Sequence, residues 1–451
     1  MNWTADLVRQ AYAAGGDGVS DAAQGAARVS LWDGLAVMAA APALEPATRP
    51  FHDLALAAGP GPCTLLAGGK SGPAAAALAN GALSHALDFE DTFDAAGLHP
   101  NAVAIPALLA LAESADLRFG RLLDALALAC DAACRIGMAL PDDPAARGWY
   151  HPPMIAAAGA AVGAAWMLGL PQEAAIAAIS LSLVQFSLTD ALKRSPLSDL
   201  RCVRDGFAAR AVVDGTLLAQ GGVTGTIDPL GQDGLIGTLT GKAPLPATGP
   251  ATGPNIGPSP APFDLWGQHV TLKVWPSCRG THPAIATALF LRDQGIAPDD
   301  IESVTFQVNP PDDMLFTPQA DRQRPRNPIM AKFSIPFTFA HSFHHGAISL
   351  HSFSEAAIKD EQTLALSQKV SLESCSRDLA PSLRLTFNKG PGQKIEYHRL
   401  MPAPVHLAGE RIPDEIRNKV EDCRAFATVE SRQFIGRVLG ADRNLKLAEF
   451  L

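Results

Sequence analysis

Ala- and Gly-rich segments with helical periodicity fill most of the first 240 residues, and no other feature constrains the fold as much. Alanine has the highest helix propensity, and its small side chain lets neighbouring helices approach closely. Several segments carry a proline near their start, where its missing N–H costs nothing. No convincing alternating strand pattern interrupts this half of the chain. The apolar spacing predicts helices over Asp21–Ala39, Gly72–Leu87, Ala102–Ala115, Phe119–Ala139, Pro153–Leu168, Pro171–Arg194 and Gly206–Gly221.

The pattern changes at residues 241–262, a run of Gly, Pro, Thr and Ser that has little to bury and predicts a loop or linker. Beyond it, alternating residues predict strands over Gln268–Trp275, Glu302–Val308, Gln368–Leu372, Leu383–Asn388 and Lys394–Arg399. Helical patterns alternate with these strands, over His282–Asp293, Pro336–Gly346 and Ser352–Lys359, and a charged helical tail follows at Pro413–Leu451.

We therefore expect a mainly α protein with an α+β part. Residues 1–262 and 401–451 would form an all-helical domain, and residues 263–400 an inserted α+β lid domain. A cleft between two such domains is a usual place for a small-molecule site.

The formal net charge of −9 argues against a nucleic-acid-binding protein, which normally presents a basic face. An anionic substrate would therefore need a local cluster of cations. The seven cysteines are odd in number and scattered, which is typical of a reducing cytoplasm. The first ten residues lack the apolar run of a signal peptide, and the longest uncharged apolar stretch, Met154–Leu170, fits a core helix better than a membrane span. The sequence predicts a cytoplasmic protein that binds neither nucleic acid nor membrane.

The first candidate site is the segment HALDFEDTFDAAGLHP at 85–100, which lies between two predicted helices. An ionised carboxylate beside a histidine raises the imidazole pKa and fixes its tautomer, so such a segment has the residue types of an acid/base centre. An acidic loop with a helix cap and one exposed histidine is the alternative interpretation. The residues crowded into the segment are His85, Asp88, Glu90, Asp91, Asp94 and His99.

The second candidate is the turn KVWPSCRGTHP at 273–283, where a predicted strand ends and a helix begins near His282. Backbone N–H groups at the helix start, with Lys273 and Arg279 nearby, form a natural receptor for a carboxylate. Lys273 can also polarise a developing enolate. A strand-to-helix turn with two solvated cations explains the pattern equally well. Cys278 is interpreted as structural, because no histidine partner arrangement accompanies it locally.

Two further clusters carry weaker signals. His151 directly precedes an Ala/Gly-rich helix, where a histidine is more often a cap or a packed residue than a catalyst. A solvated face is the default explanation for a cluster of cations, although such a cluster also offers local counter-charge for an anionic ligand. The cations in question are Lys193, Arg194, Arg201 and Arg204.

Two motifs are rejected. The GGKSG run at 68–72 resembles a phosphate-binding loop, but that loop needs a glycine at position 64, which is threonine. His341 and His345 are spaced like a zinc-binding pair, yet no glutamate lies between them and no third ligand is evident. We therefore expect no metal site.

Five further blocks of the sequence carry a joint pattern. They are NGALSHALDFEDT and HPNAVAIPALLALAE within 80–113, YHPPMIAAAGAAVGAAWMLGL at 150–170, GFAARAVVDGTLLAQGGVTG at 206–225, LKVWPSCRGTHPAIATALFLRD at 272–293 and AKFSIPFTFAHSFHHG at 331–346. These blocks span most of the chain, and together they resemble the MmgE/PrpD family, in whose order they occur. Members of that family include 2-methylcitrate dehydratase, cis-aconitate decarboxylase and iminodisuccinate epimerase.

The resemblance implies a helical domain built from both termini, an α+β lid, a homodimer, and an interdomain site without metal or organic cofactor. The residues at the family's active-site positions, expected to be catalytic, are Asp88, Thr92, His99, His151, Lys273 and His282. The residues expected to contact the substrate are Arg201, Arg204, Ser277, Cys278, Arg279 and Phe337.

Two positions depart from the family pattern. Arg201 stands where the family has lysine; it keeps the charge and can bind a carboxylate with two hydrogen bonds, but it cannot release a proton at useful pH. Phe337 stands where the family has tyrosine, so a hydroxyl that could donate to substrate is missing.

The expected activity is proton abstraction next to a carboxylate of a small di- or tricarboxylic acid. His99 or His151 would be the base or acid, oriented by Asp88, with His282 as the second proton carrier. Lys273, Arg201 and the turn at 277–280 would grip the carboxylates. A 2-methylcitrate- or citrate-type dehydratase, a hydro-lyase, is the first expectation. An iminodisuccinate-type epimerase, a cis-aconitate-type decarboxylase and an inactive carboxylate-binding homologue are the alternatives.

Overall fold

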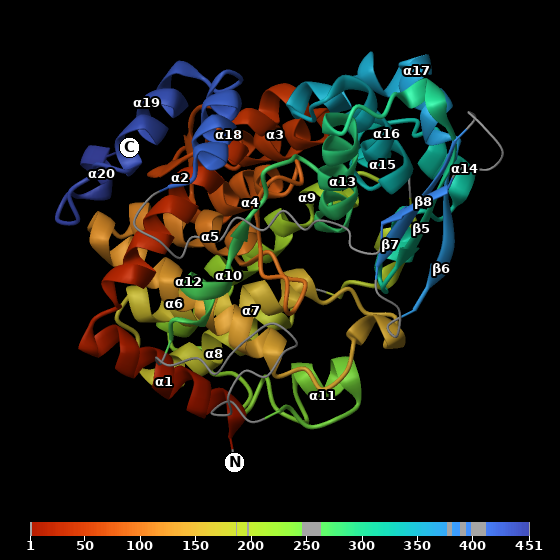
Figure 1. Ribbon diagram of the computed structural model, residues 1–451. Helices are drawn as coiled ribbons and strands as arrows, with labels where there is room; N and C mark the ends of the chain where they lie inside the picture. The colour runs from red at the N-terminus through yellow and green to blue at the C-terminus, as the bar shows by residue number, and fades with distance from the viewer. Residues whose placement is uncertain are drawn as a thin grey trace. The chain divides into compact units, whose positions relative to one another are not determined.

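The computed structural model describes residues 2–185, 187–195, 198–245, 263–376, 381–387, 394–397 and 412–450. The chain divides into two compact units. Unit 1 comprises Met1–Leu192, Leu200–Leu272 and Val405–Leu451, and unit 2 comprises Lys193–Asp199 and Lys273–Pro404. Helices dominate and the sheets are small, so the expected fold class, mainly α with an α+β part, is confirmed (Figure 1).

Unit 1 is a bundle of helices from both ends of the chain (Figure 1). The helices are α1 (Trp3–Asp17), α2 (Asp21–Leu44), α3 (Arg49–Ala57), α4 (Pro73–Ser84), α5 (Pro100–Ser114), α6 (Phe119–Met138), α7 (Pro152–Met167), α8 (Gln172–Leu183), α9 (Leu200–Val203), α10 (Asp205–Gln220), α11 (Leu235–Thr240), α12 (Leu265–His269), α18 (Asp414–Arg424), α19 (Val429–Val438) and α20 (Leu447–Phe450). Two antiparallel pairs of very short strands join them: β1 (Cys63–Thr64) with β2 (Lys70–Ser71), and β3 (Asp91–Thr92) with β4 (Thr271–Leu272).

Small side chains let the central helices of unit 1 pack closely. A Cβ atom added to Gly159 on α7 would lie 2.5 Å from the backbone nitrogen of Ala133 on α6. One added to Gly163 would lie 2.5 Å from the carbonyl oxygen of Ala125. Every residue of α7 is buried, as expected for a core helix. No helix in the described part of the chain combines the length and the apolar character that a membrane crossing requires.

Unit 2 combines a four-stranded sheet with helices (Figure 1). The strand order is β6-β5-β7-β8, where β5 (Ile301–Val308) runs parallel to β6 (Val370–Cys375) and antiparallel to β7 (Ser382–Phe387), which pairs antiparallel with β8 (Lys394–Tyr397). The helices are α13 (His282–Asp293), α14 (Gln319–Gln323), α15 (Pro328–Lys332), α16 (Ile335–His345) and α17 (Glu361–Ser367). An apolar cluster that includes Ile285, Phe337 and Leu364 forms part of the core between these helices.

Several predicted elements are wrong in type or extent. The predicted helix Pro171–Arg194 ends at Leu183, because the chain beyond it leaves the helix to pair with the segment before His151. Most of the predicted strand Gln268–Trp275 is absent, since α12 extends to His269 and β4 has only the two-residue β3 to pair with. Ser352–Lys359 forms parts of two 3₁₀ turns, the usual conformation of such short helical pieces.

Short strands also occur in the first half of the chain, where no strand was expected. Most of the predicted linker, residues 246–262, and the predicted domain boundary at 401 lie outside the described residues, as do the last residues of two predicted strands, 388 and 398–399.

Candidate functional site

The segment between α4 and α5 is folded tightly against the two helices. The Ser84 hydroxyl, in the last turn of α4, donates to the carbonyl oxygen of Ala102 in α5 at 2.6 Å. The chain then turns at Asp88, whose φ of 52° lies in the left-handed region and whose N–H donates to the carbonyl oxygen of His85 at 3.0 Å. A non-glycine residue persists in this conformation only where its surroundings fix it, and such residues concentrate at functional sites.

His99 is the N-cap residue of α5 and is followed by Pro100. Its Nδ1 atom lies 2.8 Å from the carbonyl oxygen of Asp91. Because a carbonyl oxygen can only accept, Nδ1 carries the proton and Nε2 keeps a lone pair in the neutral ring. The Asp91 carboxylate in turn accepts from the N–H of Asn101 at 3.1 Å. Burial raises the pKa of Asp91 well above its ordinary value, and the nearby Glu90 raises it further.

A buried glutamate links two histidines in this segment. Glu90 Oε1 lies 2.7 Å from Nδ1 of His85 and 3.1 Å from Nδ1 of His99. The His99 side chain is 18% exposed, whereas those of His85 and Glu90 are 3% and 2% exposed. His99 is therefore the member of this cluster that solvent or a ligand can reach. Among the described residues, these three also bring potential metal-ligand atoms within 4.8 Å of one another.

A buried ion pair supports the same segment from behind. Lys419 of α18 lies 2.8 Å from the carboxylate of Asp33 on α2 and donates to the carbonyl oxygen of Phe89 at 2.5 Å. The two charged side chains are at most 1% exposed. Burial raises the pKa of Asp33, and the Lys419 charge opposes this rise. The C-terminal part of the chain thus fixes the backbone next to Glu90.

Two arginines bring positive charge to the same region, and the ring of a tyrosine lies against one of them. Arg204 is 2% exposed, lies over the ring of Tyr150 at 4.9 Å and pairs with Asp205 at 3.6 Å. Its guanidinium donates to the carbonyl oxygen of Arg201, which is itself buried. Burial lowers the pKa of Arg204, but the charge of Asp205, then Tyr150, and then the carboxylates of the 85–100 segment outweigh this effect and raise it.

The same charged groups act on the pKa of Tyr150. Burial raises the pKa of its hydroxyl, while Arg204 and Arg201 lower it, and Asp88 is among the carboxylates that act on it. Asp88, Arg201 and Arg204 therefore all lie close enough to Tyr150 to change its pKa. The two arginines form a local cluster of cations, which an anionic substrate of an acidic protein would need.

The remaining predicted residues of unit 1 lie on its strands and helix ends. Thr92 is buried in β3 and donates to Asp94 at 3.2 Å. His151 is half-buried at the N-cap of α7, directly before Pro152. The N–H of Tyr150 donates to the carbonyl oxygen of Leu188 at 3.0 Å, which anchors the segment that carries His151.

In unit 2, the predicted turn forms a short 3₁₀ helix that runs into α13. Lys273 and Ser277 are fully buried, and the Ser277 hydroxyl lies 2.7 Å from that of Thr281. The first residue of α13, His282, has Nε2 at 3.1 Å from the carbonyl oxygen of Trp275. Nε2 of His282 therefore carries the proton in the neutral ring, and Nδ1 keeps the lone pair, the reverse of His99.

The other predicted residues of unit 2 have different surroundings. Cys278 and Arg279 are half-buried, and the Cys278 N–H donates to the carbonyl oxygen of Lys332 at 3.0 Å. Burial raises the pKa of Asp312 to about 7, and Arg279 opposes this rise. Phe337 is fully buried in the apolar cluster of unit 2, with its ring 5.8 Å from that of His341. A packed core position accommodates phenylalanine without a hydrogen-bond partner.

The sequence predicted neither the contact of Glu90 with two histidines nor the Asp33–Lys419 ion pair behind it. His85 and Glu90 belonged to the crowded segment, but only the fold shows that one carboxylate oxygen contacts both rings. Lys419 and Asp33 are 386 residues apart, so no local pattern could have paired them. The sequence around Tyr150 likewise gave no sign of its contact with Arg204.

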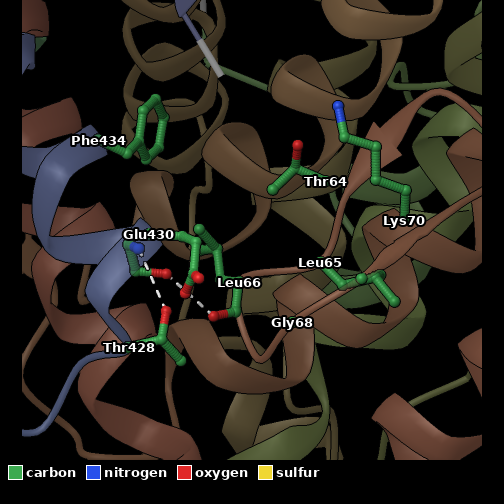
Figure 2. Close-up of a pocket in the computed structure, with 10 residues that line it drawn as sticks. Thr64, Leu65, Leu66, Gly68, Lys70, Thr428, Glu430 and Phe434 are labelled. Carbon is green, nitrogen blue, oxygen red and sulfur yellow. Dashed lines mark hydrogen bonds between the residues drawn. The ribbon is translucent and has the colours of Figure 1, made fainter.

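A separate cavity of about 410 Å³ lies in unit 1 between the β1–β2 turn and α19. Figure 2 shows Thr64 and Lys70 on one side of it and Glu430 and Phe434 on the other. Its lining contains no histidine and none of the predicted site residues. Lys70 of the GGKSG run is an exposed residue of β2.

Comparisons with known proteins identify the family of this chain. Residues 6–247 match the MmgE/PrpD N-terminal domain, and residues 275–380 match the MmgE/PrpD C-terminal domain. A cis-aconitate decarboxylase-like protein, oryM, of Aspergillus oryzae is 30% identical over 164 residues, which is 35% of this chain and 34% of that protein. A cis-aconitate decarboxylase of Aspergillus terreus is 30% identical over 170 residues, 36% of this chain and 34% of that protein. The matches thus cover about a third of each relative's length. The two domain matches together span most of the chain, which belongs to the MmgE/PrpD family.

Proposed function

We propose that this protein is a cofactor-independent enzyme that moves a proton at the carbon next to a carboxylate of a small di- or tricarboxylic acid. The observation that supports the proposal most directly is the state of His99. Its Nδ1–H is engaged by the Asp91 carbonyl oxygen, so its partly exposed ring offers Nε2 as a base. The buried cations Arg201 and Arg204 supply positive charge in a chain of net charge −9.

The proposed roles follow from this chemistry. His99 Nε2 removes the proton next to the carboxylate, and the negative charge moves onto the carboxylate oxygens. Lys273, Arg201 and the turn at 277–280 stabilise that charge, as cations and backbone donors do in related proton abstractions. His282, with a lone pair on Nδ1, is the second proton carrier. His151 is the alternative partner, and Asp88 orients the acid/base histidine.

Dehydration of a citrate- or 2-methylcitrate-type acid is the first proposed reaction. The acid protonates the departing hydroxyl, which leaves as water while the double bond forms. Decarboxylation is the second candidate, and the similarity to cis-aconitate decarboxylases supports it. In that reaction CO₂ leaves and the acid protonates the resulting carbanion. An epimerase would instead exchange one proton between two faces of the carbon, and an inactive homologue would bind the acid without turnover.

Incubation in D₂O with citrate, 2-methylcitrate, cis-aconitate and iminodisuccinate separates these reactions. Deuterium gain without loss of water or CO₂ indicates epimerisation, a new alkene absorbance indicates dehydration, and released CO₂ indicates decarboxylation. Binding by calorimetry without turnover or exchange on the whole panel would indicate the inactive homologue. Full activity in both His99→Ala and Lys273→Ala would contradict the proposed residues.

We further propose a cytoplasmic homodimer. All seven cysteines lie in the described part of the chain and none of them forms a disulfide there, which suits a reducing compartment. Light scattering after size-exclusion chromatography tests the dimer: a monomeric mass at micromolar concentration would contradict it.

A further inference from the structure

The His85–Glu90–His99 cluster has an order of depth. His99 is partly exposed, Glu90 lies behind it, and His85 contacts the same Glu90 oxygen from a position that is also buried. The two imidazole ring centres are 5.2 Å apart. A carboxylate fixed between an outer and an inner imidazole can set the orientation of the outer ring without touching a ligand.

We propose that Glu90 and His85 are positioning residues for His99: Glu90 holds the His99 ring with Nε2 directed to the substrate, and His85 holds the Glu90 carboxylate. This inference rests on the proposed function, in which His99 Nε2 moves the proton. When His99 gains a proton, its ring becomes a cation, and the Glu90 carboxylate at 3.1 Å from Nδ1 stabilises it.

The surroundings of Glu90 keep this arrangement rigid. The backbone beside it is held by the bond from Lys419 to the carbonyl oxygen of Phe89, and Asp91 caps the start of α5. Both neighbours of Glu90 in the sequence are therefore fixed, which limits the positions its side chain can adopt. A rigidly held partner is what an acid/base histidine requires for a constant ring orientation.

A metal ion on the same three residues is a different proposal, and the contacts favour the proton network. An ion bound to Nδ1 of His99 would need the lone pair of that atom, whereas Nδ1 donates its proton to the Asp91 carbonyl oxygen. Glu90 Oε1 lies 2.7 Å and 3.1 Å from the Nδ1 atoms of the two rings, and these are ion-pair distances once a ring is protonated.

The first test measures turnover of Glu90→Gln with the acid that the D₂O panel identifies. We expect kcat to fall about 10- to 100-fold with little change in KM. This decrease is smaller than the ~10⁴-fold effect of losing the orienting aspartate of a serine protease, because the Asp91 carbonyl oxygen still fixes the tautomer. Glu90→Asp should recover part of the loss, and His85→Gln should show a smaller decrease. The matched control is Glu113→Gln, a buried glutamate that accepts from Thr64 and should keep wild-type kcat.

The second test needs no substrate. In protein labelled with ¹⁵N-histidine, the His99 signals are those missing from His99→Gln. We expect wild-type His99 to be the Nδ1–H tautomer, and its Nδ1–H signal to shift in Glu90→Gln and His85→Gln but not in Glu113→Gln. Unchanged signals in the first two variants, or wild-type kcat in folded Glu90→Gln, would overturn the positioning role while leaving the proposed function intact. If Glu90→Gln fails to fold, the His85→Gln signal decides.

Absence of turnover and exchange in the wild type would instead reject the proposed function and leave the NMR result valid. Loss of activity after treatment with a chelator, restored by a divalent metal bound in a 1:1 ratio, would replace the positioning network with a metal site.

Discussion

Two histidine clusters with a neighbouring carboxylate lie in the described part of the chain, and they differ in what the carboxylate contacts. In unit 1, Glu90 contacts His85 and His99 and is 2% exposed. In unit 2, Asp360 lies 3.0 Å from Nε2 of His345, but it is 27% exposed and caps α17, accepting from the Thr363 hydroxyl at 2.6 Å.

The same residue types therefore have different surroundings in the two units. The unit 2 cluster joins the end of α16 to the start of α17, because the capping carboxylate is already committed to the helix N-terminus. The unit 1 carboxylate lies behind a reachable imidazole, which is the arrangement of an acid/base group. Residue type and spacing alone do not distinguish the two clusters. The contacts that each carboxylate makes, and its exposure, do distinguish them.

The largest difference between the two clusters is expected in how their mutation changes turnover. His99→Gln should lower kcat/KM by about 10²- to 10⁴-fold, the usual contribution of a general acid or base. His345→Gln, the matched change in the unit 2 cluster, should leave kcat/KM within about twofold of wild type. Steady-state kinetics on the acid identified by the D₂O panel measures both, and equal losses would remove the distinction between the clusters.

The buried Asp33–Lys419 ion pair of unit 1 should show the next largest effect, which is on the free energy of unfolding. Lys419→Met leaves the Asp33 carboxylate buried without its partner, which we expect to lower the free energy of unfolding by about 3–5 kcal/mol. Lys359→Met breaks an exposed pair with Glu355 beside the unit 2 cluster and should cost less than about 1 kcal/mol. Urea unfolding monitored by circular dichroism compares them. A small loss in Lys419→Met would show that the pair does not hold the site segment.

A pH dependence of stability is expected from His341, whose ring centre lies 4.4 Å from that of His345 in the unit 2 cluster. Burial, followed by the charge of His345, lowers the pKa of His341 to about 4. The folded state therefore favours the neutral ring, so this contribution is complete above the ordinary histidine pKa and is lost as the pH falls toward 4. Between about pH 7.5 and about pH 5 the wild type should lose about 2 kcal/mol that His341→Leu does not lose.

Unfolding of both proteins in urea across this pH range measures the difference. His351→Leu, an exposed histidine of the same unit, is the control and should keep the wild-type slope. Parallel pH profiles for wild type and His341→Leu would contradict a neutral buried ring.

The smallest effect concerns the capping role of Asp360. Asp360→Ala should destabilise the protein by about 1 kcal/mol, whereas Asp360→Asn should cost little, since asparagine caps helices as well as aspartate does. Thermal unfolding is sufficient for this comparison. Equal losses in both variants would mean that the negative charge beside His345, and not the cap, is what matters.

Much of the fold could be predicted because local patterns determine it. The His282–Asp293 helix was predicted with its exact limits, since a proline follows its first residue and apolar residues recur at helical spacing. The predictions failed where contact with a distant segment determines the extent of an element. Strand β4 is short because it pairs with the two-residue β3. Helix α8 ends early because the chain beyond it pairs with the segment before His151.

The candidate site could likewise be predicted only where local sequence determines it. The sequence identified the 85–100 segment and His99, whose His-Pro pair begins a helix. It could not show that Glu90 contacts two rings, or that Lys419 reaches Phe89 from 330 residues away, because those contacts exist only after the helices pack.

The most direct test of the central claim follows the proton itself. Wild type and His99→Gln are incubated in D₂O with the acid identified by the panel, and mass spectrometry of the recovered acids measures deuterium at the carbon next to the carboxylate. Rapid incorporation is expected with the wild type, and almost none with folded His99→Gln that still binds the acid. Incorporation at the wild-type rate in His99→Gln would show that another group moves the proton and would contradict the account.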